Sequence, residues 1–265
     1  EIMPSLVGSE MCIRDRFSQE DYPADKVVNS FGVQDDFLYD YAIPVLNQRA
    51  ATGQPFFATL LSISNHPPYV IPPFFHPKTS EPETQIVEYA DWALRQFFEE
   101  ARKQPWFDNT IFVLEGDHGK LVGDAECELP ESYNHIPLMI YSSRIQPEEK
   151  TTFGGQVDIQ PTILGLLNID YLQNNFGVDL LKEERPCMFY TADNMVVGRN
   201  DTLLYLYNYE TQQELTYDIG NGKLNAVPMD DSFLPLKEYS FSMLQSAEFL
   251  VKHGKTLNSI PFTQQ

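Results

Sequence analysis

Residues 110–120 read TIFVLEGDHGK, an apolar run that ends in a glycine, an aspartate, a histidine and a second glycine. A short apolar run bounded by turn formers predicts a strand buried on both faces, here over 110–114. Asp117 and His118 follow this strand directly. A carboxylate oxygen beside an imidazole nitrogen suits a cation such as zinc or manganese. A plain aspartate-led turn with a surface histidine explains the same residues, so the rest of the chain must decide.

The segments around this stretch alternate between strand and helix patterns. Short apolar runs predict two more buried strands, and apolar residues at helical spacing predict four helices. In chain order these are a helix over 35–50, a strand over 56–63, a helix over 84–103, a strand over 136–142 and helices over 157–169 and 231–253. Short segments around tight turns between residues 187 and 220 predict antiparallel strands. The alternation predicts an α/β fold with a mostly parallel sheet flanked by helices and small antiparallel strands towards the C-terminus.

The charge of the chain limits its partners. Its 265 residues include 38 acidic and 18 basic side chains, a net charge of −20. Such a surface repels phosphate backbones, so no nucleic acid is expected as a partner. A polyanionic substrate would need local positive charge, which a bound divalent cation supplies. No run of about 18 apolar residues occurs in the sequence, so none of its segments is predicted to span a bilayer.

The first residues differ from the rest of the chain. Residues 1–16 read EIMPSLVGSEMCIRDR, which has no apolar core and is therefore not a secretory signal. This stretch resembles the translation of sequencing-adapter read-through, and we expect it to be a non-native leader. Native sequence is expected from residue 17, with the natural N-terminal part missing.

The cysteines predict no metal site. Cys12, Cys127 and Cys187 contain no pair at metal-ligand spacing. A disulfide between Cys127 and Cys187 stays open.

Two more histidines lie near predicted strand ends. In open α/β sheets, ligands bind beyond the carboxyl ends of the strands. Asn65 and His66 follow the predicted strand 56–63, so we expect His66 and Asp117 to share one cleft. His66 is either a donor to an anionic substrate or a loop histidine packed on prolines. His135 begins the predicted strand 136–142, where a structural hydrogen bond explains it as well as a functional role.

Four segments in order carry a family resemblance. They are FFATLLSISNHPPYVIP at 56–72, the stretch from YADWALRQ to LEGDHG at 89–119, HIPLMIYS at 135–142 and QVDIQPTILGLLNI at 156–169. Over residues 17–220 the chain resembles the C-terminal half of the catalytic domain in the alkaline phosphatase/sulfatase superfamily. It is most similar to the lipoteichoic-acid-synthase-like phosphoglycerol transferases and to the phosphoethanolamine transferases.

The resemblance implies roles for four residues. Asp117 and His118 would ligate a divalent metal ion, manganese or zinc, and His66 would contact a phosphate-bearing substrate. His135 would contact the same substrate or a second metal ion. In this family a threonine attacks the phosphorus, and no threonine here matches that motif. We therefore expect the nucleophile-bearing half to lie outside this chain and the chain alone to be inactive.

Three functions compete at this point. The first is a partial phospho-group transferase acting on a phosphate-bearing lipid or glycan at the extracytoplasmic face of a bacterial membrane, with the full-length protein membrane-anchored. The second is a sulfatase, and the third is a non-catalytic binding domain that retains the fold. The expected organisation is a leader over 1–16, the partial catalytic domain over 17–220 and a helical C-terminal extension over 221–265.

Overall fold

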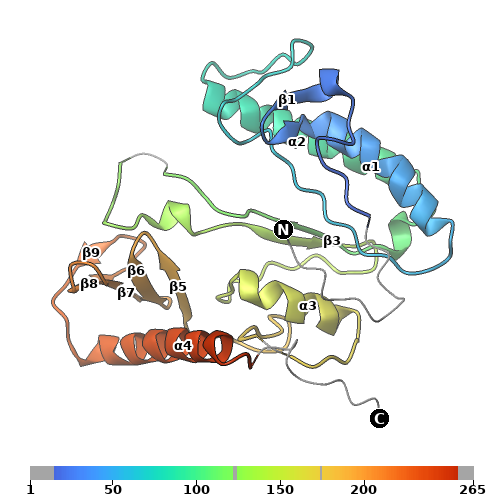
Figure 1. Ribbon diagram of the computed structural model, residues 1–265. Helices are drawn as coiled ribbons and strands as arrows, with labels where there is room; N and C mark the ends of the chain where they lie inside the picture. Colours follow the sequence, from blue (N-terminus) through green and yellow to red (C-terminus); the bar gives the residue numbers. More distant parts are fainter. Residues whose placement is uncertain (1–14, 122–123, 174, 256–265) are drawn as a thin grey trace. The chain divides into compact units, whose positions relative to one another are not determined.

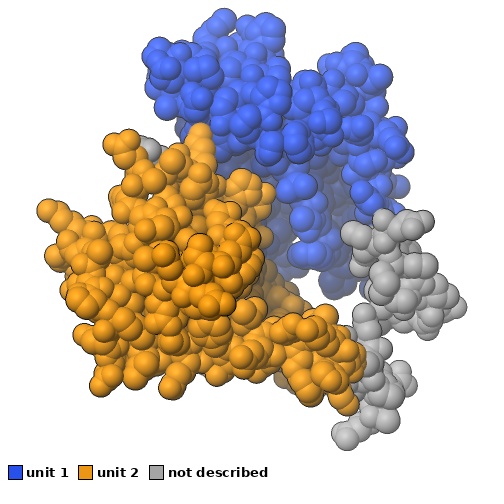
Figure 2. Space-filling model, turned by 60° about the vertical axis from the view of Figure 1, so that its left-hand side comes forward, with its two compact units in different colours: residues 1–113, 140–146 blue, residues 114–139, 147–265 orange. Residues whose placement is uncertain are grey.

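The chain divides into two compact units, shown in blue and orange in Figure 2. The computed structural model describes residues 15–121, 124–173 and 175–255. Unit 1 comprises residues 1–113 and 140–146, and unit 2 comprises residues 114–139 and 147–265. Most of the predicted leader, including Cys12, lies outside the described residues. This division reflects spatial compactness, so the predicted limits at residues 16 and 220 stay predictions.

Two helices form the core of unit 1 (Figure 1). They are α1 (Asp35–Ala50) and α2 (Pro82–Ala101), which confirm the helices predicted over 35–50 and 84–103. The buried face of α2 repeats every three or four residues, the helical period. It consists of Ile86, Tyr89, Ala93, Phe97 and Ala101. Burying each large apolar side chain stabilises the unit by about 1.5–3 kcal/mol. Unit 1 also contains η1 (Ala24–Lys26), η2 (Phe107–Asn109) and the paired strands β1 (Val27–Asn29) and β2 (Gly32–Val33).

Strands form within two of the three predicted buried runs, but neither strand is buried on both faces: Leu138 is 36% exposed and Met139 is 54% exposed. β3 (Phe112–Glu115) and β4 (Leu138–Tyr141) form a two-stranded sheet, and the division between the units falls within both strands. In unit 1 the ring of Phe98 packs against Phe112 and Tyr141, with centroid distances of 5.0 and 5.8 Å. Among the described residues, this pair is the part of the predicted central sheet that forms.

The prediction of a strand over 56–63 is wrong. These residues are extended but belong to none of the strands in the described part of the chain. Phe57 is 88% exposed and Leu61 is 73% exposed. A strand exists only where its N–H and C=O groups pair with another segment, and a buried one also needs both faces covered. An apolar run alone meets neither condition.

An antiparallel sheet dominates unit 2. Its five strands pair in chain order: β5 (Met188–Ala192), β6 (Met195–Arg199), β7 (Leu203–Asn208), β8 (Gln213–Asp218) and β9 (Asn225–Ala226). Asp193 and Asn194 connect β5 to β6 with φ of 45° and 64°, as expected for a two-residue hairpin turn. The predicted antiparallel strands are confirmed, and with them the α/β class with a small antiparallel part.

Both faces of this sheet are covered. Leu204 and Leu206 of β7 join Leu129 on one face, while Tyr205 points to the other face. There it joins Leu236 of α4 (Leu234–Lys252), the helix predicted over 231–253. Figure 1 shows α4 in red beside the sheet. The alternation follows from the period of two in a strand.

A buried ion pair fixes the start of α3 (Ile159–Leu166), the helix predicted over 157–169. The side chains of Asp158 and Arg185 are 0% and 2% exposed and form two charge-assisted hydrogen bonds. Asp158 also accepts from the amides of Gly155 and Val178, both at 2.8 Å. Arg185 donates to the hydroxyl of Tyr239 on α4 at 3.2 Å. These contacts join η4 (Gln156–Asp158), the 175–185 loop and α4.

Two sequence questions are answered here. Cys127 and Cys187 are both free thiols, so the disulfide left open does not form. None of the described helices has the length and apolar character that crossing a bilayer requires.

Candidate functional site

The Asp117–His118 pair lies in unit 2, two residues after the end of β3. Gly116 donates its amide to the carbonyl of Pro137 at 3.4 Å, and Gly119 donates to Tyr133 at 2.9 Å. A Cβ on Gly119 would overlap the carbonyl oxygen of Ser132. Glycine is therefore needed at 119 for the pair to pack against the 131–137 segment.

The hydrogen bonds of the pair set the state of the imidazole. Nδ1 of His118 lies 2.7 Å from the carbonyl oxygen of Gly119. A carbonyl only accepts, so Nδ1 carries the hydrogen and the neutral ring keeps its lone pair on Nε2. Nε2 lies 3.8 Å from Oδ2 of Asp117, whose Oδ1 accepts from the amide of His118 at 2.9 Å. Both side chains thus offer one unshared ligand atom on the same side.

This geometry fits two ligands of one divalent cation. Zinc binds imidazole nitrogen and carboxylate oxygen at about 2.0–2.2 Å, so two ligands at the tetrahedral angle lie about 3.4 Å apart. The 3.8 Å separation of the two atoms is close to this value, and a small rotation of either exposed side chain would reach it. The side chains of His118 and Asp117 are 69% and 78% exposed, so they are open to an ion from solvent. No group of three or more His, Cys, Asp and Glu residues forms a complete metal site in the described part of the chain.

Gln156 binds the backbone of the Asp117–His118 pair. The sequence did not predict this role. Nε2 of Gln156 donates to the carbonyl of Asp117 at 2.9 Å and to that of Gly116 at 3.2 Å. The residue lies within the QVDIQPT stretch, but nothing in the sequence indicates a contact 39 residues away.

His135 belongs to the segment that contacts the pair. Its backbone amide donates to the carbonyl of Glu131 at 2.8 Å, and its side chain is exposed. Glu131 forms an ion pair with Arg199 of β6, which attaches this turn to the sheet. The next residue, Ile136, would touch a Cβ on Gly116 at 3.4 Å. The structure therefore brings Asp117, His118 and the turn bearing His135 together, and its substrate role stays a prediction.

His66 lies in unit 1, on a corner attached to the start of α1. Its ring is exposed, its Nδ1 lies 2.6 Å from the carbonyl of Pro67, and its centroid lies 4.1 Å from that of Phe31. The corner is anchored by Ser64, whose hydroxyl donates to Gln34 at 2.8 Å. The predicted cleft shared by His66 and Asp117 involves both units and stays a prediction.

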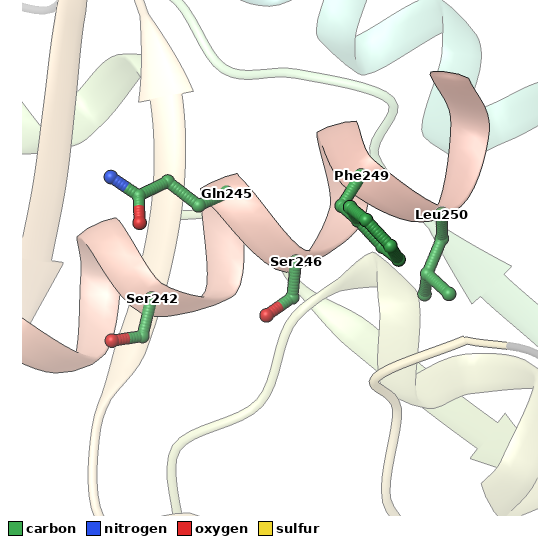
Figure 3. A pocket seen from close by; sticks show the side chains of 5 residues that line it. All are labelled: Ser242, Gln245, Ser246, Phe249 and Leu250. Carbon is green, nitrogen blue, oxygen red and sulfur yellow. The ribbon is translucent and has the colours of Figure 1, made fainter. Parts of the chain in front are cut away.

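A depression on unit 2 offers no competing catalytic site. Figure 3 shows the residues that line it, which all belong to α4: Ser242, Gln245, Ser246, Phe249 and Leu250. These side chains include no imidazole, carboxylate or thiolate ligand for zinc or manganese, and they provide no acid or base near neutral pH.

Comparison with known proteins places the chain in a family. Residues 9–169 match the family model described as Sulfatase, more than half of the chain. The chain belongs to the sulfatase family. Family membership covers the stretch that contains His66, Asp117, His118 and His135.

Curated relatives of this sulfatase-family chain include lipoteichoic acid synthases. Lipoteichoic acid synthase 1 of Bacillus subtilis (strain 168) is 27% identical over 221 residues, which are 76% of this chain and 33% of that protein. Lipoteichoic acid synthase of Staphylococcus saprophyticus is 28% identical over 182 residues, 59% of this chain and 27% of that protein. The chain thus spans about a third or less of the length of these relatives.

Solved structures confirm the fold. An alkaline phosphatase superfamily protein from Vibrio parahaemolyticus aligns with a TM-score of 0.76 and 24% identity, covering 90% of this chain and 59% of that one. Lipoteichoic acid synthase LtaP from Listeria monocytogenes aligns with a TM-score of 0.72 and 22% identity, covering 92% of this chain and 64% of that one. Together with the family model, these folds confirm the resemblance to the alkaline phosphatase/sulfatase superfamily, and the curated relatives show a similarity to lipoteichoic acid synthases.

Proposed function

We propose that this chain is part of a metal-dependent phospho-group transferase that acts on phosphodiesters, as in phosphoglycerol transfer. Asp117 and His118 hold a divalent cation, manganese or zinc, and His66 and His135 contact the phosphate-bearing substrate. The observation that supports this most directly is the 3.8 Å separation of His118 Nε2 and Asp117 Oδ2, with Nδ1 of the ring occupied by the Gly119 carbonyl. The similarity to lipoteichoic acid synthases favours a phosphate over a sulfate ester.

The residues of the site perform different parts of this chemistry. A bound divalent cation supplies positive charge that stabilises the charge developing on the transferred phosphoryl group. Asp117 contributes a negative ligand and His118 a neutral one, so the pair leaves a dipositive ion with net positive charge for the substrate. In unit 2 the turn at 131–135 presents His135 as a donor to phosphate oxygens. No residue of this chain is proposed as the nucleophile.

The proposal extends to location and substrate class. We place the enzyme on the extracytoplasmic face of a bacterial membrane, with the full-length protein anchored there and a phosphate-bearing lipid or glycan as substrate. An anionic surface of net charge −20 would repel such a substrate. The cation at Asp117 and His118 then provides the local attraction that the protein surface lacks.

Metal titration tests the proposal. The 265-residue chain is titrated with Mn²⁺ and separately with Zn²⁺ by calorimetry, beside Asp117→Asn, His118→Gln and the exposed control Asp201→Asn. We expect one metal-binding site, whose affinity falls at least about tenfold in the first two variants and is unchanged in the control. Equal affinities in all four proteins would remove the basis of the proposal.

Ligand choice tests the reaction class. The Mn²⁺-loaded chain is offered bis(p-nitrophenyl) phosphate or p-nitrophenyl sulfate, with binding followed by NMR and turnover by absorbance. We expect the phosphodiester to bind more tightly, to depend on His135, and not to be turned over by this chain alone. Preference for the sulfate ester would favour the sulfatase alternative, and turnover above that of Asp117→Ala would contradict the expected inactivity.

A further inference from the structure

The carbonyls of Gly116 and Asp117 converge on one side-chain amide. β3 ends at Glu115, so these two carbonyls come after the last residue of the strand. Nε2 of Gln156 lies 3.2 Å from the first and 2.9 Å from the second. A carboxamide nitrogen has two hydrogens, so one side chain satisfies both acceptors.

One of these bonds acts on the peptide unit that orients the pair. The carbonyl of Asp117 and the amide of His118 belong to the same planar peptide group. The carbonyl accepts from Gln156, and the amide donates to Oδ1 of Asp117 at 2.9 Å. Rotation of this peptide would break both bonds at once. Gln156 thereby opposes the motion that would turn the Asp117 carboxylate away from the His118 ring.

The backbone at Gln156 is held in place by buried hydrogen bonds. Gln156 is the first residue of η4, and its neighbour Gly155 donates its amide to Asp158 at 2.8 Å. Asp158 is fully buried and paired with Arg185 through two hydrogen bonds. The Gln156 side chain is exposed, so its position depends on this backbone and on the two carbonyls.

We propose that Gln156 is a positioning residue for the Asp117–His118 pair. Its amide fixes the peptide groups before and after Asp117 so that the two ligand atoms stay within the span of one cation. The metal part of this inference rests on the proposed function, whereas the ordering of the backbone does not.

The experiment uses the 265-residue chain and three variants. Gln156→Met keeps the length of the side chain but removes the donor, and Gln156→Lys provides a donor of similar reach. Gln245→Met is the matched control, because Gln245 is exposed on α4 of the same unit and the hydrogen bonds described for the pair involve other residues. Hydrogen exchange by mass spectrometry follows peptides covering 114–121, and calorimetry measures Mn²⁺ affinity.

The expected result is local. In Gln156→Met, exchange over 114–121 accelerates at least about fivefold, the lower limit for the loss of two hydrogen bonds, while peptides of β5–β8 and the melting temperature stay unchanged. Mn²⁺ affinity falls about tenfold, the lower end for residues that support metal ligands. Gln156→Lys restores slow exchange, and Gln245→Met matches the wild type.

Two outcomes would overturn the inference. Unchanged exchange over 114–121 in Gln156→Met would show that the amide does not hold this backbone. Acceleration spread equally over unit 2 would assign Gln156 to general stability. If the wild type binds no Mn²⁺, the proposed function fails, and the exchange measurement still decides whether Gln156 orders the pair.

Discussion

Asp35 and Ser64 are joined by two hydrogen bonds. The amide of Ser64 donates to Oδ1 of Asp35 at 3.0 Å, and the amide of Asp35 donates to Oγ of Ser64 at 3.1 Å. The amide of Ile63 donates to the same carboxylate oxygen at 3.0 Å. The first turn of α1 therefore holds the corner that carries His66, and a negative charge there is favourable beside the positive end of the helix dipole.

Asp35→Ala should destabilise unit 1 strongly. The substitution removes the acceptor of two amides and is expected to lower the free energy of unfolding by about 2–4 kcal/mol. Asp35→Asn keeps an oxygen acceptor and should cost less. Both tryptophans, Trp92 and Trp106, lie in unit 1, so urea unfolding followed by tryptophan fluorescence reports this unit.

Asp40→Ala is the control for this helix. Asp40 is exposed on α1 and has no part in the corner. An exposed substitution of this kind changes stability by about 0.5 kcal/mol or less. If Asp35→Ala cost no more than Asp40→Ala, the carboxylate would not be what fixes the His66 corner.

Arg185→Met should destabilise unit 2. The Asp158 carboxylate would stay fully buried without its guanidinium, which costs about 3–5 kcal/mol. Lys252→Met is the comparison, because it breaks the exposed pair with Glu248 on α4, which contributes about 0.5 kcal/mol or less. Hydrogen exchange of β5–β8 peptides in urea measures the stability of unit 2 in both variants. Similar effects of the two variants would be inconsistent with a buried anchor at the start of α3.

Tyr39 should make unit 1 sensitive to alkaline pH. Burial, assisted by the charge of Asp35, raises the pKa of Tyr39 from 10.0 to about 12. The folded state then holds the phenolic proton more tightly than the unfolded state. The resulting stabilisation is fully present below about pH 10 and is lost as pH rises to about 12, an order of 2–3 kcal/mol.

A pair of phenylalanine variants checks this pH dependence. Urea unfolding is followed by tryptophan fluorescence at about pH 9 and about pH 11.5. The loss of stability between these values should be smaller in Tyr39→Phe than in the wild type. Tyr209→Phe, which alters a 53% exposed ring in unit 2, should behave as the wild type. An identical loss in all three proteins would mean that Tyr39 does not titrate as inferred.

Local periodicity explains which elements were predictable. Ile86, Ala93 and Phe97 recur at helical spacing in the sequence and form the buried face of α2. The bounds of the helix were therefore predicted within about two residues. The segment 56–63 has an equally apolar sequence, yet Phe57 is exposed and unpaired with any strand among the described residues. Strand formation depends on a partner segment, and sequence alone does not show whether one is present.

The sequence predicted only the part of the site that depends on neighbouring residues. Asp117 and His118 are adjacent, so their ligand chemistry is visible in the sequence. Their support comes from distant residues: Gln156 lies 39 positions away from Asp117, and Arg185 lies 27 positions from Asp158. Asp158 lies at the start of the helix predicted over 157–169, but its buried partner Arg185 becomes visible only in the folded chain.

Gly119→Ala and Gly116→Ala form a discriminating pair at this site. A Cβ at 119 would overlap the backbone carbonyl oxygen of Ser132, whereas one at 116 would meet the Ile136 side chain at an ordinary 3.4 Å. Gly119→Ala must therefore shift the backbone of the pair or of the turn that carries His135, at a cost of about 1–3 kcal/mol. Gly116→Ala should be tolerated.

The measurements are Mn²⁺ affinity and hydrogen exchange over 114–121 and 131–137. Gly119→Ala should lower the affinity for Mn²⁺ and speed hydrogen exchange in both segments, because the hydrogen bond from Gly119 to Tyr133 joins them. Gly116→Ala should leave both readings near the wild type. If Gly119→Ala bound Mn²⁺ as tightly as Gly116→Ala does, the contact with the 131–137 segment would have no part in holding Asp117 and His118, and the case for one site containing His135 would lose its structural basis.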